Sequence, residues 1–394
     1  MMSPSPHDWQ EYTIGDCLRR VERPVEVDPN ALYTQIGIRS HGKGLFYKEP
    51  VTGESLGNKA VYWIEPDCFV LNIVFAWEQA IGKTTQAEVG MIGSHRFPMY
   101  KPVDNLVDID YLIFYLLTKR GTDVLEAASP GGAGRNRTLG QERFLKSKII
   151  LPPIEEQRRI AEILATQDKV IELQIRKIEE LKRFKQGCLE RMFPRKGQKV
   201  PEKRFPGFTG DWEQRKLGDM CQITMGQSPD GATYSDMPSD YILVQGNADL
   251  KNGWVCPRIW TTQKTKTAEA GDLIMSVRAP AGAMGKTNYN VVLGRGVAGI
   301  KGNEFVYQTL VKMDEDGYWK KLAAGSTFES INSEVISNVV ISVPQDVDEQ
   351  EKLGAYFHNL DNLITLHQRK LDEMKKLQKA LMQILLTGKV RGNV

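Results

Sequence analysis

The sequence predicts an α+β protein in which two mainly β domains with short helices alternate with two long helices. An internal repeat runs through the 394-residue chain, and two matching segments carry a heptad pattern of apolar residues. The balance of 41% hydrophobic and 26% charged residues is typical of a folded globular chain. The expected order is a domain at 1–153, a helix at 154–193, a linker at 194–204, a domain at 205–344 and a helix at 345–390.

The two domains begin with the same short motifs. Asp8-Trp9 recurs as Asp211-Trp212, and Ile14-Gly15-Asp16 recurs as Leu217-Gly218-Asp219. Both matches have the same offset of 203 residues. The region between the halves, 194–210, is rich in Pro, Gly, Lys and Arg, which is typical of an extended linker.

The helical segments repeat more strongly. At an offset of 193 residues, nine positions are identical without a gap, namely Glu156, Gln157, Asp168, Ile171, Leu173, Arg176, Lys177, Glu180 and Lys182. Unrelated helices often share apolar positions, but they seldom share the polar ones as well. The two helical segments are therefore copies of one unit.

A 4-3 spacing of mostly apolar residues predicts a coiled coil in each helix. The first copy visits Ile160, Leu164, Gln167, Ile171, Gln174, Ile178, Leu181, Lys185, Cys188 and Met192, and the second visits Leu353, Phe357, Leu360, Ile364, His367, Leu371, Met374, Gln378, Leu381 and Leu385. Each helix is the simplest partner for the other, with the polar positions fixing their register. A structural coiled-coil adaptor, which dimerises or spaces other proteins, is an alternative function for such helices.

Both variable domains contain loop and strand-end residues suited to DNA. Strands are expected at 59–64, 68–74, 240–245, 272–277 and 335–343, and a helix at 108–128. Arginine pairs with guanine, and Asn or Gln with adenine, in the major groove. For any single residue, a solvated surface charge is the simpler interpretation. The candidates are Arg39, His41, Lys43, Lys48, Lys83, His95, Arg96, Arg135, Asn136, Arg137, Gln245, Asn247, Lys251, Arg258, Lys264, Lys266, Arg278, Lys286, Asn288 and Arg295. The first choices for bidentate base contact are Arg135, Arg137, Arg278 and Arg295, because neighbouring glycines let the backbone approach a duplex.

Composition and motif searches restrict the function classes. The net charge of +3 neither favours nor excludes nucleic acid. Five scattered cysteines without a zinc spacing, and the lack of a signal peptide or long apolar run, indicate a cytoplasmic protein with no membrane contact and no metal site. Two Gly-Lys-Thr sequences, at 82–84 and 285–287, lack the first glycine of a phosphate-binding loop. A loose nuclease pattern of Asp230, Asp249 and Lys251 leaves a stand-alone DNA endonuclease as an alternative.

Particular segments resemble a known family. Residues 151–164 read LPPIEEQRRIAEIL, and residues 200–212 read VPEKRFPGFTGDW, followed by Leu217-Gly218-Asp219. These segments, and the alternation of variable domain and repeated helix over the whole chain, resemble the specificity subunit of type I restriction–modification systems. The distal copy, VPQDVDEQ at 343–350, has one proline where the first copy has two.

The resemblance implies that each domain is a target-recognition domain reading one half of a split, asymmetric double-stranded DNA site. It implies helices packed antiparallel with pseudo-two-fold symmetry, which act as a ruler and dock two modification (methyltransferase) subunits. Restriction and translocase subunits would join them. Catalytic residues and cofactors (S-adenosylmethionine, ATP and Mg) would then belong to the partners and not to this chain. The expected partner contacts are polar helix residues: Gln157, Arg158, Asp168, Arg176, Lys177, Glu180, Gln350, Asp361, Arg369, Lys370 and Glu373.

Overall fold

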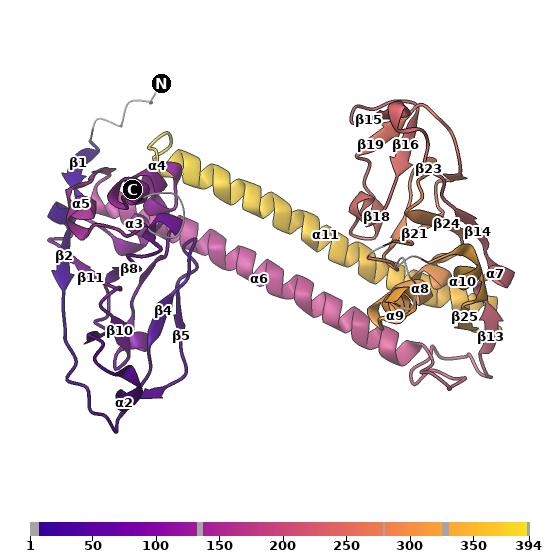
Figure 1. Ribbon diagram of the computed structural model, residues 1–394, viewed down its shortest axis with the longest axis horizontal. Helices are drawn as coiled ribbons and strands as arrows, with labels where there is room; N and C mark the ends of the chain where they lie inside the picture. The colour runs from indigo at the N-terminus through magenta and orange to yellow at the C-terminus, as the bar shows by residue number, and fades with distance from the viewer. Residues whose placement is uncertain (1–7, 132–136, 279, 325–330, 392–394) are drawn as a thin grey trace. The chain divides into compact units, whose positions relative to one another are not determined.

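The computed structural model describes residues 8–131, 137–278, 280–324 and 331–391. The chain forms two compact units: unit 1 comprises residues up to 173 and from 371 onward, and unit 2 comprises residues 174–370. Two helices of 39 residues, α6 (Ile154–Met192) and α11 (Val347–Leu385), each contribute one part to unit 1 and the other part to unit 2 (Figure 1). Each unit therefore contains one β domain and part of each long helix.

The β domain of unit 1 is built on a four-stranded antiparallel sheet with the strand order β2-β11-β8-β9. Two-stranded pairs β1-β12, β10-β7, β3-β6 and β4-β5 complete it. Its elements are β1 (Gln10–Thr13), α1 (Ile14–Cys17), β2 (Leu18–Val21), β3 (Leu32–Tyr33), β4 (Ile36–Ile38), β5 (Leu45–Tyr47), β6 (Val51–Thr52), α2 (Gly53–Leu56), β7 (Val61–Trp63), β8 (Phe69–Leu71), η1 (Ala76–Glu78), β9 (Ile81–Lys83), η2 (Gln86–Glu88), β10 (Ile92–Ser94), β11 (Met99–Pro102), α3 (Ile109–Leu116), α4 (Lys119–Ala128), α5 (Gln141–Lys146) and β12 (Lys148–Leu151).

The β domain of unit 2 has two larger sheets, with the orders β14-β24-β21-β22-β18-β17 and β15-β19-β16-β23-β20, and the pair β13-β25. Its elements are β13 (Glu213–Lys216), α7 (Leu217–Met220), β14 (Gln222–Met225), η3 (Gly231–Thr233), β15 (Tyr234–Ser235), β16 (Tyr241–Val244), η4 (Asn247–Asp249), β17 (Leu250–Lys251), β18 (Trp254–Val255), β19 (Ile259–Thr261), β20 (Thr267–Ala268), β21 (Leu273–Ser276), β22 (Met284–Lys286), β23 (Val291–Leu293), β24 (Val297–Lys301), α8 (Glu304–Glu315), α9 (Tyr318–Ala324), α10 (Ser333–Asn338) and β25 (Val340–Val343).

The two β domains share one framework. The order β2-β11-β8-β9 corresponds to β14-β24-β21-β22, and the pair β1-β12 corresponds to β13-β25. The repeated Gly-Asp motif lies where α1 packs on α5 and α7 packs on α10. A Cβ at Gly15 would lie 3.2 Å from the Leu145 carbonyl oxygen, and one at Gly218 would lie 2.8 Å from the Ser337 Cβ. The motif is repeated because both contacts leave little room for a side chain.

Each domain core includes the ends of both long helices. In unit 1, Leu164 near the start of α6 and Leu385 at the end of α11 lie in one core cluster with Phe144. In unit 2, the end of α6 and the start of α11, including Phe357, pack with Trp212. Burial of each such large apolar side chain contributes about 1.5–3 kcal/mol. The helices are thus anchored in the domains by their apolar ends.

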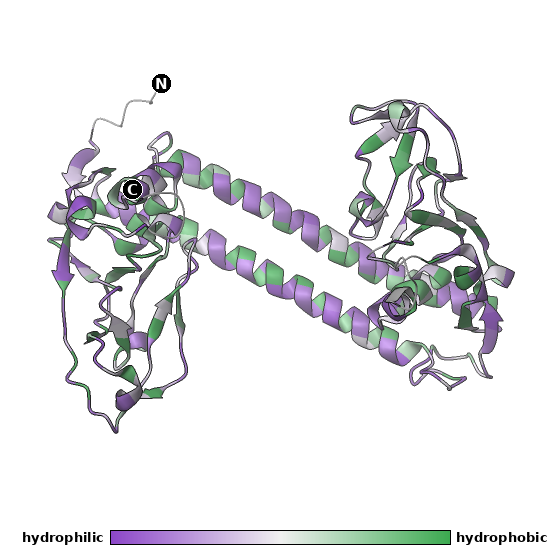
Figure 2. Ribbon diagram, in the orientation of Figure 1, coloured by the Kyte–Doolittle hydropathy of each residue, from purple (hydrophilic) through white to green (hydrophobic). Residues whose placement is uncertain are grey.

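Within unit 1 the start of α6 packs with the end of α11, so the two helix halves run antiparallel. Farther along the pair, the Gln167 amide donates to the Met374 carbonyl oxygen over 3.5 Å. The Gln378 amide donates to the carboxylate of Asp168. Both long helices are mainly hydrophilic with hydrophobic residues at intervals, as the heptad pattern requires (Figure 2).

Unit 2 has the same antiparallel pairing. The Gln174 amide nitrogen lies 2.9 Å from the His367 Nδ1 and donates to the His367 carbonyl oxygen over 2.8 Å. Lys185 Nζ lies 2.7 Å from the Asp361 carboxylate. Gln174 and His367 are equivalent positions of the two helix copies, so the predicted polar layer is where the copies bond to each other. The Lys185 ion pair corresponds, by the offset of 193, to the amide–carboxylate bond of unit 1.

Two segments differ from the sequence-based expectation. The expected helix at 108–128 is two helices, α3 and α4, because Thr118 is extended and its hydroxyl accepts from the Gly121 N–H to cap α4. The expected strand at 335–343 begins instead as helix α10, because the Asn332 side chain accepts from the Val335 N–H and caps it. Only 340–343 is a strand. In both cases a local cap prevails over the apolar pattern.

Candidate nucleic-acid interface

In unit 1, three segments far apart in the sequence meet just after strand β8. The Ile73 N–H donates to the Arg96 carbonyl oxygen over 3.0 Å, and the Leu139 N–H donates to the Ile73 carbonyl oxygen over 2.8 Å. These bonds join the β8–β9 loop, the β10–β11 turn and the segment before α5. The Arg137 guanidinium lies 5.5 Å from the ring centre of Trp77 in the same loop. The three segments therefore bring Arg96, its neighbour His95 and Arg137 together beside the β8–β9 loop.

The β4–β5 hairpin adds further cationic residues at this place. The His41 N–H donates to the Glu78 carbonyl oxygen over 2.8 Å, and the next N–H donates to that of Gln79 over 2.9 Å. The Arg39 guanidinium covers the ring of Phe46 at 5.0 Å. Arg39, His41 and Lys43 of the hairpin loop thus lie beside η1, and all three residues are exposed.

Other candidates of unit 1 lie elsewhere. Lys48 is at the opposite end of the hairpin from its loop, because its N–H donates to the Gln35 carbonyl oxygen. Lys83 is half-buried and its ammonium lies 2.7 Å from the Asp110 carboxylate. Arg135 and Asn136 lie outside the described residues. Trp77 was missed by the sequence analysis, although an indole in a short loop between two apolar strands is a usable signal.

Unit 2 repeats the same backbone arrangement with different side chains. The Val277 N–H donates to the Gly296 carbonyl oxygen over 2.9 Å, and the Ile331 N–H donates to the Val277 carbonyl oxygen over 2.9 Å. These bonds join the β21–β22 loop, the β23–β24 turn and the segment before α10. The turn carries Arg295 next to Gly296, which is the equivalent of Arg96 in unit 1, and Arg278 lies on the loop equivalent to the β8–β9 loop.

A hollow of about 290 Å³ opens at this position in unit 2. It brings together four residues that the sequence analysis proposed, Gln245, Asn247, Arg278 and Arg295. Two serines that the sequence analysis missed, Ser228 and Ser276, also line it. Neither serine lies in a motif, so only the fold shows that they belong to this hollow.

The remaining candidates of unit 2 do not line this hollow. Lys251 is on β17 at the edge of the six-stranded sheet, and Asn288 follows β22; both are exposed, as are Lys264 and Lys266. Arg258 pairs with the carboxylate of Asp249 at 2.8 Å.

The expectation that Lys286 contacts DNA is wrong. Its side chain is buried, and its ammonium lies 2.8 Å from the Glu304 carboxylate and 3.2 Å from the His358 Nδ1. It also lies over the rings of Trp254 and Tyr307, at 4.9 and 4.6 Å. Lys83 pairs in the same way with the first turn of α3, so the lysine of each Gly-Lys-Thr sequence ties a strand end to the next helix.

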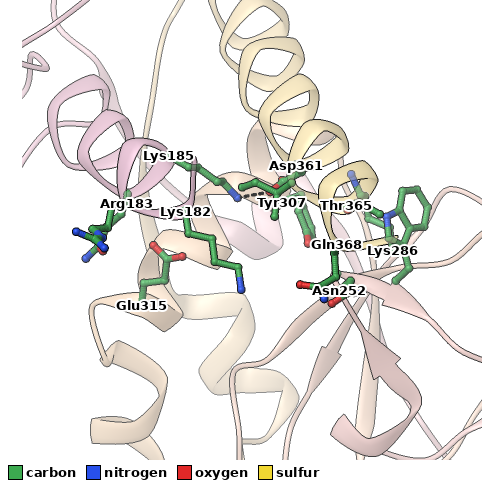
Figure 3. Close-up of a pocket in the computed structure, with 14 residues that line it drawn as sticks. Lys182, Arg183, Lys185, Asn252, Lys286, Tyr307, Glu315, Asp361, Thr365 and Gln368 are labelled. Carbon is green, nitrogen blue, oxygen red and sulfur yellow. Dashed lines mark hydrogen bonds and ion pairs between the residues drawn. The ribbon is translucent and has the colours of Figure 1, made fainter. Parts of the chain in front are cut away.

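Lys286 also lines a cavity of about 450 Å³ in unit 2, bounded by α6, α11, β18 and α8. Figure 3 shows Lys185 of α6 reaching across to Asp361 of α11 at this cavity. The Gln308 amide donates to the same aspartate over 2.7 Å. Burial raises the pKa of the Glu315 carboxyl. The hydrogen bond from Gln308 of α8 to Asp361 of α11 joins the β domain to the helix pair.

The nuclease pattern has a structural explanation. The Asp249 carboxylate is buried, and it accepts from the N–H groups of Gln245 and Gly246 over 2.7 and 3.2 Å and from Arg258. Asp230 instead caps η3, with its side chain accepting from the Ala232 N–H over 3.0 Å. Within the described residues, no group of three or more His, Cys, Asp and Glu side chains could hold a metal ion. Within the same part of the chain, no helix is long and apolar enough to span a bilayer.

Four of the expected partner contacts make bonds inside the chain, and for the buried Gln157 the expectation is wrong. Gln157 is fully buried and its amide donates to the carbonyl oxygens of Leu106 and Pro152. Asp361 and Asp168 accept bonds across the helix pair, as described above. Gln350 is half-buried and donates to the Pro344 carbonyl oxygen over 3.0 Å. The exposed candidates are Arg158, Arg176, Lys177, Glu180, Arg369, Lys370 and Glu373.

The long helices also expose apolar side chains at equivalent positions. Val170 corresponds to Leu363, Leu173 to Leu366, and Phe184 to Leu377, and the members of each pair are exposed to nearly the same extent, 40/40%, 55/60% and 51/52%. Single exposed apolar residues are ordinary on a protein surface. Three matched pairs at heptad-related positions are a repeated feature, and we call them the outer stripe.

Comparison with known proteins is consistent with this geometry. The family model described as the type I restriction modification DNA specificity domain matches the chain twice, at residues 51–183 and 209–376. The MjaX type I restriction enzyme specificity subunit of Methanocaldococcus jannaschii is 27% identical over 74% of this chain and 71% of its own length. The MjaVIII specificity subunit of the same organism is 23% identical over 98% of this chain and 94% of its own length.

Solved structures show the same fold. A type I restriction–modification system S subunit from M. genitalium, at 13% identity, gives a TM-score of 0.62 with 98% of both chains covered. A chain from a study of complex assembly and conformational transition of the type I R-M system, at 23% identity, gives 0.60 with 98% of this chain and 100% of that chain covered.

Proposed function

The chain belongs to the type I restriction–modification DNA specificity family, and from this premise we propose that each of its units reads one half of a bipartite, asymmetric site in double-stranded DNA. The observation that carries the proposal is the repeated backbone arrangement after β8 and β21. In unit 1 this arrangement carries arginines, and in unit 2 it carries arginines together with two amide side chains. Side chains that differ at equivalent positions of the two domains are suited to reading two half-sites of different sequence.

Two readers in one chain bind one duplex bivalently. Once the first reader is bound, the second contact is effectively intramolecular and gains affinity without any new interaction. Lysine and arginine around each reader would contact phosphates and provide a salt-dependent term, while arginine and amide side chains at base edges provide specificity. A structural adaptor has no need for these two clusters.

We further propose that the outer stripe docks two copies of a modification subunit. The stripe occurs on both helix copies with apolar side chains at equivalent positions and of nearly equal exposure, which is what two identical partners require. The exposed repeated charges, such as Arg176 and Arg369, would surround the apolar contacts and orient the partner. The helices thereby serve as both spacer and docking surface.

Catalysis is proposed to belong to those partners and to restriction and translocase subunits, which would bring S-adenosylmethionine, ATP and Mg. The side chains of the nuclease pattern support this assignment. Asp249 is neutralised by Arg258 and two backbone N–H groups, and Asp230 caps a separate turn. We infer that this chain supplies recognition and assembly.

Exchange of one reader tests the division of labour. Replacing residues 205–344 with the corresponding region of another specificity subunit should change one half of the methylated site and keep the other, whose contacts come from residues 1–153. Methylome sequencing of cells that express the chimera with the modification subunit gives the readout. A chimera that alters both half-sites at once would show joint reading and contradict the proposal.

The docking surface predicts a selective loss of assembly. The double variant Leu173→Glu and Leu366→Glu should weaken binding of the modification subunit by at least tenfold, because two apolar contacts are replaced by charges that must be desolvated. Size-exclusion chromatography and titration with the purified modification subunit measure the effect. Val200→Glu, an exposed apolar residue of the linker, is the matched control. Unchanged binding of the double variant would exclude the stripe as the docking surface.

A further inference from the structure

The hollow of unit 2 has the construction of a preorganised recognition site. Four backbone segments form it: the chain after β14, the chain after β16, the start of the β21–β22 loop and the β23–β24 turn. They are in direct contact, since a Cβ at Gly296 would lie 2.0 Å from the Gln245 carbonyl oxygen and one at Gly226 would lie 2.0 Å from the Gly294 carbonyl oxygen. Glycine is required at both positions for the segments to come this close.

A buried charge network fixes the chain after β16. The carboxylate of Asp249 accepts from the N–H groups of Gln245 and Gly246, and Arg258 neutralises it from the other side. The aspartate therefore holds the turn that presents Gln245 and Asn247 to the hollow. In the β23–β24 turn, Arg295 is held by Ser228, whose hydroxyl accepts from the N–H and Nε of Arg295 over 3.2 and 3.3 Å.

Three of the lining side chains are available to bind a ligand that offers hydrogen-bond acceptors. Among the described residues, the side chains of Gln245, Asn247 and Arg278 have no hydrogen-bond partner, and the lining contains no acidic residue. The hollow therefore offers two guanidinium groups and two amides. Arginine pairs bidentately with the O6 and N7 acceptors of guanine, which is the commonest base-specific contact in the major groove.

We propose that this hollow reads a guanine through Arg295 or Arg278, and that Asp249 with Arg258 is the positioning pair that holds its reading turn. The inference rests on the proposed function and specifies the chemistry of one of its two readers. Because Asp249 contacts the backbone of the turn and does not line the hollow, it acts through Gln245 and Asn247.

The arginine arm of the test uses Arg295→Gln and Arg278→Gln in the full chain, expressed with its modification subunit. Methylome sequencing should show that one guanine position of the half-site read by unit 2 becomes degenerate, with discrimination reduced roughly 5- to 150-fold, while the other half-site is retained. Uniform weakening over all sequences, with a lower salt slope, would identify these arginines as phosphate contacts and overturn the proposal.

The positioning arm compares Asp249→Ala with Asp230→Ala, a turn-capping aspartate of the same domain that does not line the hollow. Asp249→Ala should relax base discrimination in that half-site, and Asp230→Ala should leave the methylated sequence unchanged. Loss of thermal stability without any relaxed position would show that Asp249 is only structural. If the chimera of residues 205–344 fails to change one half-site, the proposed function itself fails; if the chimera succeeds and these variants do not relax a guanine, only the present inference fails.

Discussion

Arg204→Ala should destabilise unit 2 by about 3–5 kcal/mol, because it leaves a buried carboxylate without its counter-ion. Glu349 in the first turn of α11 is 1% exposed, and Arg204 binds both of its oxygens, at 2.6 and 2.7 Å. The same guanidinium donates to the carbonyl oxygens of Gly210 and Thr209, at 2.7 and 3.1 Å. Urea denaturation of the purified chain measures the free energy of unfolding.

The control for this prediction lies in the same linker. Arg195 pairs with Glu202 at 3.1 Å, but both side chains are at least half exposed, so Arg195→Ala should cost no more than about 1 kcal/mol. Adding Glu349→Gln to the Arg204→Ala variant should recover part of the loss, since the uncompensated charge is removed. A loss of less than 1 kcal/mol for Arg204→Ala alone would mean that water reaches Glu349.

Unit 1 has an equivalent of this ion pair that the sequence repeat does not reveal. Glu156 matches Glu349 at the offset of 193, and it is bound through both oxygens by Arg391 at 2.9 and 2.8 Å. Arg391 follows the end of α11 by six residues, whereas Arg204 follows the end of α6 by twelve. The glutamates were visible as an identity in the sequence, but their arginines lie in segments of unequal length and could not be aligned.

The long helices were the most predictable part of the fold, because heptad spacing depends only on the local helix period. The equivalence of Gln174 and His367 in the sequence correctly indicated a polar layer. The β domains were less predictable, since their strands are two to five residues long and pair with partners far along the chain. Caps at Thr118 and Asn332 overrode the apolar pattern in two places.

The candidate DNA residues were predictable as residue types but not as positions. Gln245, Asn247, Arg278 and Arg295 come from three separate loops, and only the tertiary contacts of those loops bring them into one hollow. Lys286 is also a polar residue at the end of a strand, but Glu304 at the start of α8 and two aromatic rings bury it. The sequence identifies residues of a suitable type, and the fold determines which of these residues are exposed.

Lengthening both helices by one heptad should widen the gap of the DNA site. Inserting seven residues between Lys177 and Ile178, and a matching seven between Lys370 and Leu371, keeps the apolar positions in register and adds about 10 Å at 1.5 Å per residue. At ~3.4 Å per base pair, this corresponds to about three base pairs. Methylation of the parent site should be lost, and methylome sequencing should show the same half-sites around a gap that is wider by three base pairs.

A heptad inserted in α6 alone is the control: it leaves one helix without a matched partner surface and should abolish methylation at either spacing. Methylation of the parent site by the double insertion, with its gap unchanged, would mean that the two helices do not determine the distance between the readers.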